Sequence, residues 1–443
     1  MLDFIINHWQ EIFATVVFGI VFLTIIFEWF DKAVVAIVGA VLLLLARILT
    51  FEEAVESINF EIIFLLAAMM IIVEIAQESG LFAWANFKLA KFSKGSPFRI
   101  FLFFTLITAI SSAFLDNVTT ILIVVPITIA LVRGMGYNPF PFVLGEIMFS
   151  NIGGALTLVG DPPNILVGTM VGIPFISFII NLWIPILAII IVTLIAFYML
   201  RWKDLKPIHH HLPKLFLSNI LLEKLKYQFA KTNLNKKYMI TVSVILVLTI
   251  AGFLLQLVIG LPLAVIAMTS AFLLMLIVHK KIHVHHVFST IEWSTLAFFA
   301  GLFMLVHGLE AVGLLDTIAH FLTGVTDNFA LLLMIVLWSA GLFSMVVDNI
   351  PFVTVMIPIL MTIEKTFTGE PHISLLWWAL ILGAALGGNG TIIGASANVI
   401  GVDLAKKQGV KITFLGYLKY SFPLTLVALT ISSAYLLIWY FYF

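Results

Sequence analysis

Two aspartate–asparagine pairs lie inside strongly apolar stretches of this chain. Asp116 and Asn117 lie in the run S-A-F-L-D-N-V-T-T, and Asp348 and Asn349 lie in the run S-M-V-V-D-N-I-P-F. A carboxylate at the middle of a bilayer costs about 3 kcal/mol even on the lenient insertion scale, so carboxylates there mark ion or proton pathways by default. We therefore interpret Asp116 and Asp348 as proton-carrying groups at matching positions of a repeat.

A second pair of matching segments is rich in glycine. The run G-G-A-L-T-L-V-G-D-P-P-N at residues 153–164 aligns without a gap to G-G-N-G-T-I-I-G-A-S-A-N at residues 387–398. Polar, glycine-broken stretches at corresponding places in two apolar halves point to a transporter with its site between the repeats. Asp161 has no acidic counterpart, which indicates a proton or cation site weighted toward the first half. The alternative is that Asp161 caps the turn before Pro162.

The elements that must position these residues are membrane helices. Of the 443 residues, 62% are hydrophobic and only 10% are charged, too few to cover a water-soluble globule. Apolar runs of about 18 residues, enough to cross a hydrocarbon core about 30 Å thick, recur from end to end. We predict an all-α polytopic membrane protein, an inverted-repeat transporter with about 10–12 transmembrane helices, broken helices and two re-entrant hairpins.

The predicted organisation has four parts. They are an N-terminal transmembrane helix (1–32), a first inverted repeat (33–200), a cytoplasmic basic linker (201–237) and a second inverted repeat (238–443). The glycine-rich segments are predicted to be re-entrant hairpins at about 145–170 and about 380–402, and the aspartate–asparagine pairs to be breaks in helices. Residues 1–10 contain no basic segment and no small-residue cleavage site, so we expect the first apolar run to be a retained helix.

Charge in the loops predicts that the two repeats are inverted. Residues 88–99 contain four basic residues, whereas the matching residues 320–332 contain Asp327 and no Lys or Arg. The segment after the second glycine-rich run carries Lys406, Lys407 and Lys411, but its counterpart near 172–177 is uncharged. Because basic loops stay cytoplasmic, matching loops face opposite sides of the membrane. We expect a multi-pass protein of the cytoplasmic (inner) membrane.

The motifs carry a resemblance to a known family. The runs S-S-A-F-L-D-N-V-T-T, S-N-I-G-G-A-L-T-L-V-G-D-P-P-N and V-D-N-I-P-F-V-T resemble the ArsB/NhaD permease family of the ion transporter superfamily. That family includes arsenite and antimonite efflux permeases, NhaD-type sodium-proton antiporters and the melanosomal P protein. The resemblance spans nearly the whole chain and looks closest to the P-protein-like branch. It implies inverted repeats with a hairpin each, and it is compatible with a homodimer.

The repeat and the resemblance together imply a set of substrate- or ion-binding residues. In the first half these are Asp116, Asn117, Thr119, Thr120, Asn151, Gly153, Gly154, Thr157, Asp161 and Asn164. In the second half they are Asp348, Asn349, Thr354, Gly387, Gly388, Asn389, Thr391, Ser396 and Asn398. The expected proton-coupling residues are Asp116, Asp348, Asp161 and Glu146. We expect no cofactor and no resident metal.

The resemblance implies proton-coupled efflux of arsenite or antimonite. The chain has no cysteine, so hydrogen-bonding Asn, Thr and Gly groups would have to bind the uncharged trihydroxide. The first alternative is sodium-proton antiport, in which Na⁺ and H⁺ compete for the same carboxylates; another ion or an organic anion is the second. An intramembrane aspartyl protease built on Asp116 and Asp348 is disfavoured, because it explains neither the asparagines nor the glycine-rich runs.

The remaining polar features define the expected partners. These are a small inorganic substrate, H⁺ and the lipid bilayer; net charge is zero, which argues against nucleic acid. No G-x-x-x-x-G-K-[ST] loop is present, so ATP dependence would require a separate soluble ATPase subunit. Glu74 aligns with His307, and we interpret both as interfacial. Histidines at 209–211 and 279–286 are interpreted as solvated loop residues rather than metal ligands.

Overall fold

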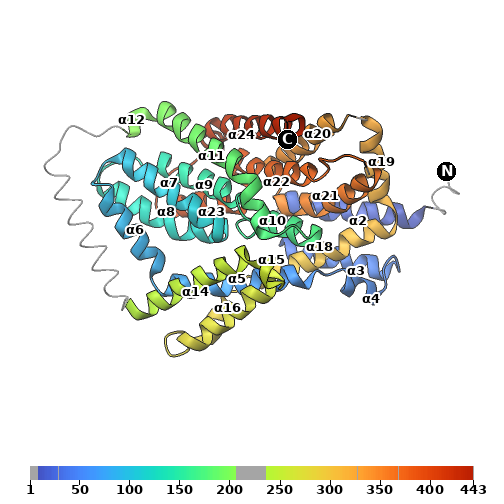
Figure 1. Cartoon of the computed structure of the whole chain (residues 1–443), viewed down its shortest axis with the longest axis horizontal. Coiled ribbons are helices and arrows are strands. Elements are labelled where there is room, and N and C mark those ends of the chain that lie inside the picture. Colours follow the sequence, from blue (N-terminus) through green and yellow to red (C-terminus); the bar gives the residue numbers. More distant parts are fainter. Residues whose placement is uncertain (1–7, 28, 206–235, 327, 368, 443) are drawn as a thin grey trace.

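Every regular element among the residues that this computed structural model describes is a helix (Figure 1). It describes residues 8–205 and 236–442 except Glu28, Asp327 and Thr368, so most of the predicted linker, His209–His211 and Asp327 lie outside the described residues. Among the described residues, nine helices are long and apolar enough to cross a membrane and three shorter ones are also apolar. The predicted all-α polytopic class is confirmed, with nine long spans and three shorter helices in place of ten to twelve full spans.

The order of helices in the first half returns in the second. The first half contains α2 (Trp9–Ile26), α3 (Lys32–Leu45), α4 (Phe51–Glu56), α5 (Phe60–Glu78), α6 (Leu81–Phe92), α7 (Pro97–Phe114), α8 (Asn117–Gly134), α9 (Phe140–Gly154), α10 (Pro162–Val171), α11 (Phe175–Leu200) and α12 (Trp202–Leu205). The second contains α14 (Lys236–Leu254), α15 (Gln256–Ile259), α16 (Leu263–Val278), α17 (Val284–Ser289), α18 (Trp293–Ala311), α19 (Leu314–Val325), α20 (Phe329–Val346), α21 (Asn349–Thr366), α22 (Leu375–Gly387), η1 (Gly388–Gly390), η2 (Ile392–Gly394), α23 (Ser396–Lys407) and α24 (Phe414–Tyr442). Since α2 has a counterpart in α14, we propose that the first repeat begins with α2 rather than at residue 33.

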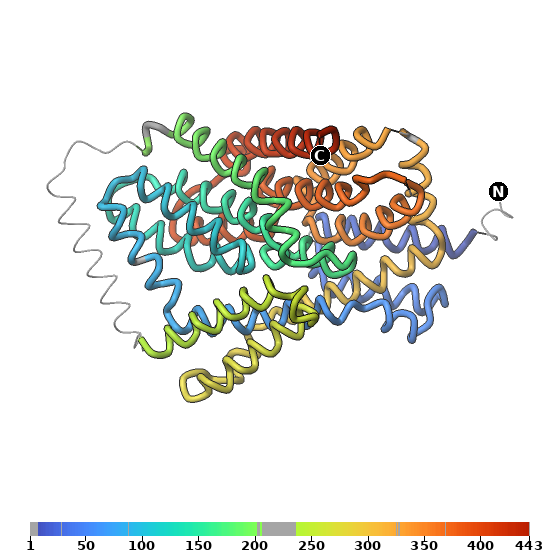
Figure 2. Tube along the Cα trace, in the orientation of Figure 1, coloured from blue at the N-terminus to red at the C-terminus, as the bar shows by residue number. Residues whose placement is uncertain are grey.

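The packing of the two halves follows a pseudo-twofold relation. Helix α3 packs on α18 as α16 packs on α5, and α7 packs on α9 as α20 packs on α22. Helix α10 reaches across to α21 and α22, and α23 reaches across to α8 and α9. Figure 2 shows this exchange, with α10 in green beside the second half and α23 in red among the cyan helices of the first. The interface between the halves is where transporters of this kind place their sites.

The aspartate–asparagine pairs lie at the tips of two helical hairpins. The ring centroids of Phe329 and Phe367 are 6.0 Å apart, which places the start of α20 beside the end of α21. Gly95, just before α7, lies against Met135, just after α8. Helices that continued in one direction would hold these ends tens of ångströms apart. Each helix pair therefore turns back on itself, at Asp116 in the first half and Asp348 in the second.

The predicted roles of the two segment types are therefore exchanged. In the described residues α9 does not pack along α10, and α22 does not pack along α23, so the segments predicted as hairpins at 145–170 and 380–402 are broken helices. The predicted breaks are the hairpin turns. Leu115 (φ −123°, ψ 157°) and Asp116 (φ −57°, ψ 141°) reverse the chain in conformations open to any residue, so this turn needs no glycine. The high glycine content therefore pointed to the wrong segments as the hairpins.

Two basic segments, one from each half, lie at the same end of the molecule, as inverted repeats require. The Arg133 guanidinium, at the end of α8, donates a hydrogen bond to the carbonyl of Gln408, at the end of α23. The contact of Gly95 with Met135 brings the basic segment 88–99 to the same end. The basic loops of both halves thus lie on one side of the protein. The loops that match them in sequence do not lie on that side.

The outer surface is apolar. Val258 is 84% exposed and Leu276 is 71% exposed, and further exposed apolar side chains lie on α2, α14 and α16. Phe149, by contrast, is fully buried within the bundle. An exposed apolar surface of this extent suits contact with lipid rather than water.

The hairpin assignment predicts a specific crosslink. Because the native chain lacks cysteine, Phe329→Cys combined with Phe367→Cys introduces the only two thiols. We expect a short bifunctional thiol reagent to join them within one chain, detected as a linked peptide by mass spectrometry. The control pair, Phe329→Cys with Val346→Cys, lies at opposite ends of α20, about 25 Å apart. Equal yields from the two pairs would contradict the hairpin.

Candidate functional site

A cavity of about 290 Å³ lies between the two hairpin tips. Both tips, both broken helices and the N-terminal ends of α3 and α18 contribute to its wall. Seven residues predicted from the sequence line it: Asp116, Asn117, Thr119, Asp161, Asp348, Asn349 and Ser396. The structure thus brings together residues that are far apart in the sequence and come from both halves.

Asp161 connects the two hairpin tips. Its Oδ1 accepts a hydrogen bond from the Asn117 amide at 3.2 Å, and its Oδ2 accepts one from the Asn349 amide at 3.3 Å. The carboxylate makes no side-chain hydrogen bond that caps α10, so it is not the turn cap that the sequence left as an alternative. Asp161 is 2% exposed. One buried carboxylate therefore holds two equivalent amides from opposite halves of the protein.

A core of asparagines lies behind Asp161. The Asn151 amide donates to the side-chain oxygens of Asn389 and Asn398, both at 2.8 Å, and so ties α9 to the second broken helix. Asn398 in turn donates to the carbonyls of Gly388 and Thr391. Asn164 does the same in the first half with the carbonyls of Gly154, Ala155 and Thr157. These amides satisfy backbone groups that the broken helices leave open.

The loop of each broken helix is fastened to its own hairpin. The Thr157 hydroxyl donates to the Ala113 carbonyl, and the equivalent Thr391 hydroxyl donates to the Met345 carbonyl. The glycines permit backbone contact. A methyl group on Gly154 would lie 2.8 Å from the carbonyl oxygen of Gly160, and one on Gly388 would lie 3.1 Å from that of Gly394. The glycine-rich runs are therefore needed for close approach rather than for turning.

Asp116 and Asp348 occupy equivalent tips but have different partners. The Asp116 carboxylate accepts a hydrogen bond from the Thr119 backbone N–H at 3.0 Å and caps α8. Asp348 makes no such cap; its Oδ2 lies 3.0 Å from the Lys32 ammonium. One tip thus carries a carboxylate paired with a cation, whereas the carboxylate of the other forms no ion pair with any described residue.

Thirteen of the predicted residues do not line the cavity; ten belong to the asparagine core and the glycine-rich loops described above, and three lie elsewhere. The hydroxyl of Thr120 bonds to the Asp116 carbonyl, and that of Thr354 bonds to the Ile350 carbonyl, so both serve their own helices. Glu146 is fully buried between α8 and α9, where Oε1 accepts a hydrogen bond from Thr128 and Oε2 has no partner. A direct contact of these three with a ligand in the cavity is not supported by this arrangement.

Two charged cavity residues were missed from the sequence. Lys32 and Glu292 line the cavity, although E-W-F-D-K reads as a loop between two spans. Helix α3 has 14 residues, about 21 Å of helix, which is too short to cross a core about 30 Å thick. The short helix places the turn before α3 at membrane depth, where a lysine is functional by default, but this length is known only from the folded chain.

The cavity has the chemistry of a hard-cation site. Its wall presents the carboxylates of Asp116, Asp161, Asp348 and Glu292 and a single ammonium, that of Lys32. Hydroxyls of Thr119, Thr295 and Ser396 add neutral oxygens. Oxygen donors of this kind suit Na⁺, Mg²⁺, Ca²⁺ or a proton rather than soft metals.

Two related halves with a charged cavity between them form the architecture of a membrane transporter. The comparisons with known proteins agree. The family model CitMHS, described as "Citrate transporter", matches residues 22–383. The chain belongs to this citrate transporter family, which also indicates a transporter rather than an enzyme.

The relatives span almost the whole chain. A "46 kDa membrane protein" of Mycobacterium leprae is 34% identical over 439 residues, covering 96% of this chain and 98% of the relative. An "Uncharacterized transporter" of Mycobacterium tuberculosis is 33% identical over 442 residues, covering 98% of this chain and 99% of the relative. The human P protein is 31% identical and covers 97% of this chain but only 60% of its own length. The resemblance to P protein is therefore confirmed, whereas assignment to the ArsB/NhaD permeases themselves stays a prediction.

A solved structure shares the fold. The YdaH transporter of Alcanivorax borkumensis aligns with a TM-score of 0.50 over 85% of this chain and 84% of its own, at 15% sequence identity. At this identity the likeness concerns the arrangement of helices, and it supports the polytopic transporter fold.

The backbone contacts of the glycine-rich helices can be tested by adding one methyl group. Gly153→Ala would collide with the backbone of Ala109, and Gly387→Ala with that of Gly341. We expect each to destabilise the protein by about 1–3 kcal/mol and to lower its melting temperature in detergent. Gly19→Ala is the control, because nothing lies within 4 Å of the added carbon. An unchanged melting temperature in both broken-helix variants would refute the close approach.

Proposed function

We propose that this chain is a secondary active transporter that exchanges a small cation for protons at the cavity between the hairpin tips. The observation that carries the proposal is the convergence of Asp116, Asp161 and Asp348, one from each tip and one from the broken helix between them. Cations and protons compete for carboxylates, so such a cavity couples the movement of one to the movement of the other.

Asp161 is the proposed centre of this exchange. When ionised, it accepts amide hydrogen bonds from both tips and still has lone pairs for a cation or a proton. A change in what Asp161 holds is therefore felt by both hairpins at once. The proposed proton carriers remain Asp116, Asp161 and Asp348; Glu146 lacks the contacts with the cavity that this role requires.

Efflux of arsenite or antimonite is less well supported by the contacts. The Asn amides that were expected to bind an uncharged trihydroxide donate hydrogen bonds within the protein, those of Asn117 and Asn349 to Asp161. The Asn151 amide bonds to other asparagines. The predicted metalloid substrate stays a prediction, and the structure favours the sodium-proton alternative.

An organic anion carried together with a cation is the second candidate. The family description "Citrate transporter" suggests a carboxylate substrate, and the Lys32 ammonium in the cavity wall is a suitable partner for one. A bare polycarboxylate would meet four protein carboxylates, so we expect it to enter with a divalent cation that neutralises part of its charge. Location in the cytoplasmic membrane, a homodimer and a separate ATPase subunit remain predictions from the sequence.

The central experiment imposes a pH gradient on proteoliposomes and records internal pH. Na⁺, Li⁺, citrate with and without Mg²⁺, arsenite and antimonite are added in turn. We expect Na⁺ or Li⁺ to collapse the gradient, and Asp116→Asn or Asp161→Asn to reduce the rate by at least about 100-fold, because each removes a proton-carrying group. The control Asp403→Asn changes an exposed carboxylate that pairs with Lys407 on α23, and it should transport normally.

The other outcomes are informative. A response only to citrate with Mg²⁺ would replace cation exchange by the second candidate, and a response only to arsenite or antimonite would restore the metalloid prediction. Normal rates in both aspartate variants would remove the carboxylates from the mechanism.

Lys32 predicts a measurable competition with the transported cation. Because its ammonium holds Asp348, Lys32→Met frees a carboxylate for an external cation. We expect Na⁺ to bind about tenfold more tightly and to raise the melting temperature of Lys32→Met more than that of the wild type. Lys32→Arg keeps the positive charge and should resemble the wild type. The same Na⁺-dependent shift in all three proteins would contradict this role.

A further inference from the structure

Three side chains with metal-ligand chemistry meet at the end of α5. Glu74 and Glu78 lie one helical turn apart on α5, and His286 approaches them from α17. The His286 Nε2 atom lies 3.9 Å from a Glu74 oxygen and 3.7 Å from a Glu78 oxygen. All three ligand atoms lie within 4.8 Å of one another. The sequence had suggested only interfacial acids and solvated loop histidines here.

We propose that Glu74, Glu78 and His286 bind a divalent transition-metal ion such as Zn²⁺. Ligand atoms about 2.0–2.2 Å from one Zn²⁺ ion are about 3–4 Å apart from each other, so small side-chain rotations would close the present arrangement on an ion. Imidazole nitrogens and carboxylate oxygens both bind Zn²⁺, and three protein ligands would leave the fourth position to water. The imidazole favours Zn²⁺ and similar ions over Mg²⁺ and Ca²⁺.

The negative charges of Glu74 and Glu78 favour the binding of a cation at this position. Glu74 and Glu78 are like charges on successive turns at the end of an apolar helix, where they repel each other. Their side chains are 20% and 27% exposed and that of His286 is 56% exposed, so the cluster lies at the surface of the bundle. Among the described residues, neither forms an ion pair with a lysine or arginine, and the ion-pair partner of both is His286. A divalent ion would offset both charges.

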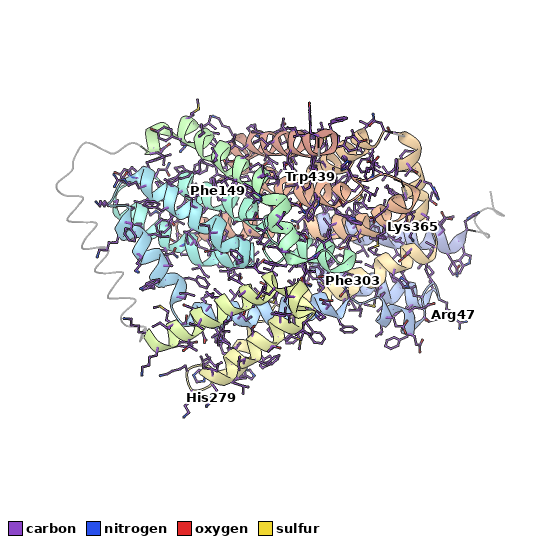
Figure 3. All side chains as sticks on the ribbon, viewed as in Figure 1. Arg47, Phe149, His279, Phe303, Lys365 and Trp439 are labelled. Atoms are coloured by element: carbon purple, nitrogen blue, oxygen red, sulfur yellow. The ribbon has the colours of Figure 1, made fainter. Side chains whose placement is uncertain are left out.

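Neighbouring elements hold the three ligands in place. Helix α17 packs on α5, and α14 packs on both α5 and α16. The Tyr238 hydroxyl of α14 donates to the carbonyl of Ile75, between the two glutamates, at 3.4 Å. His279 marks the outer end of α16, from which the chain leads to α17 (Figure 3). The site is thus built on helix ends rather than on one loop.

The pseudo-twofold relation supplies an internal comparison. In the other half the corresponding place holds Glu53 on α4 and His307 and Glu310 on α18. There the Thr50 backbone N–H and hydroxyl donate to the Glu53 carboxylate at 2.8 and 2.9 Å, and these bonds hold the pKa of Glu53 below its usual range. Glu53 is thereby occupied in capping its own helix. Only the Glu74 cluster has both carboxylates free of such bonds to the backbone among the described contacts.

The proposal is independent of the transported species, but its position connects it to the cavity. Val73, the neighbour of Glu74, lines the cavity wall. A metal ion joining α5 to α17 would therefore fix the segment of α5 that borders the cavity. Binding of the metal ion would thereby restrict the motion of a helix segment that lines the transport site.

Zn²⁺ binding to the full-length protein in detergent tests the proposal. All proteins carry an affinity tag without histidine and the changes His209→Ala, His210→Ala and His211→Ala, so that linker histidines do not contribute. Titration calorimetry with ZnCl₂ gives the affinity, and the visible spectrum with Co²⁺ reports direct coordination. We expect one site per chain, weakened at least about tenfold by Glu78→Gln or His286→Ala. The controls His285→Ala and Glu53→Gln should bind as before.

Two results would overturn the site. One is unchanged Zn²⁺ affinity in both cluster variants, and the other is an equal loss in His285→Ala. Melting temperatures without metal establish that each variant folds, and Glu74→Gln tests the same ligand set should Glu78→Gln fail to fold. Because calorimetry needs no transport, the result stands whether or not cation–proton exchange is observed.

Discussion

The arrangement of this transporter depends on one buried carboxylate that accepts hydrogen bonds from both halves. Asp161 holds Asn117 of the first hairpin tip and Asn349 of the second. A buried charge is stable only when it is well hydrogen-bonded, so the two tips must stay together while Asp161 is ionised. A proton or a cation on Asp161 changes this balance, and it does so at a residue that contacts both hairpin tips. Coupling between the halves follows from this geometry.

The two halves are alike in backbone and unlike in charge. Asp161 aligns with Ala395 of the second repeat. Lys32 is the first residue of α3, whereas Leu263 is the first residue of the equivalent helix α16. The symmetric backbone gives the protein two related hairpins, whereas the asymmetric charges place the acidic site in one position between them. The glycines and asparagines maintain the symmetric backbone, and Asp161 and Lys32 create the asymmetric charge.

The sequence alone predicted the all-α class, the repeat and seven residues of the cavity wall, because a membrane makes polar residues conspicuous. It did not distinguish the hairpins from the broken helices. Turn formation at Asp116 uses ordinary backbone angles and leaves no glycine signal, and the glycines near Gly154 serve close packing. Lys32 was missed because its depth depends on the shortness of α3, which is a property of the folded chain.

The most direct test of the central claim is proton release on cation binding. Because a carboxylate must lose its proton to hold a cation, Na⁺ added to weakly buffered, purified protein should release about one proton per bound ion, recorded with a pH-sensitive dye. We expect release from the wild type and none from Asp161→Asn. No release from the wild type, or equal release from both proteins, would contradict the proposal that cation and proton share Asp161.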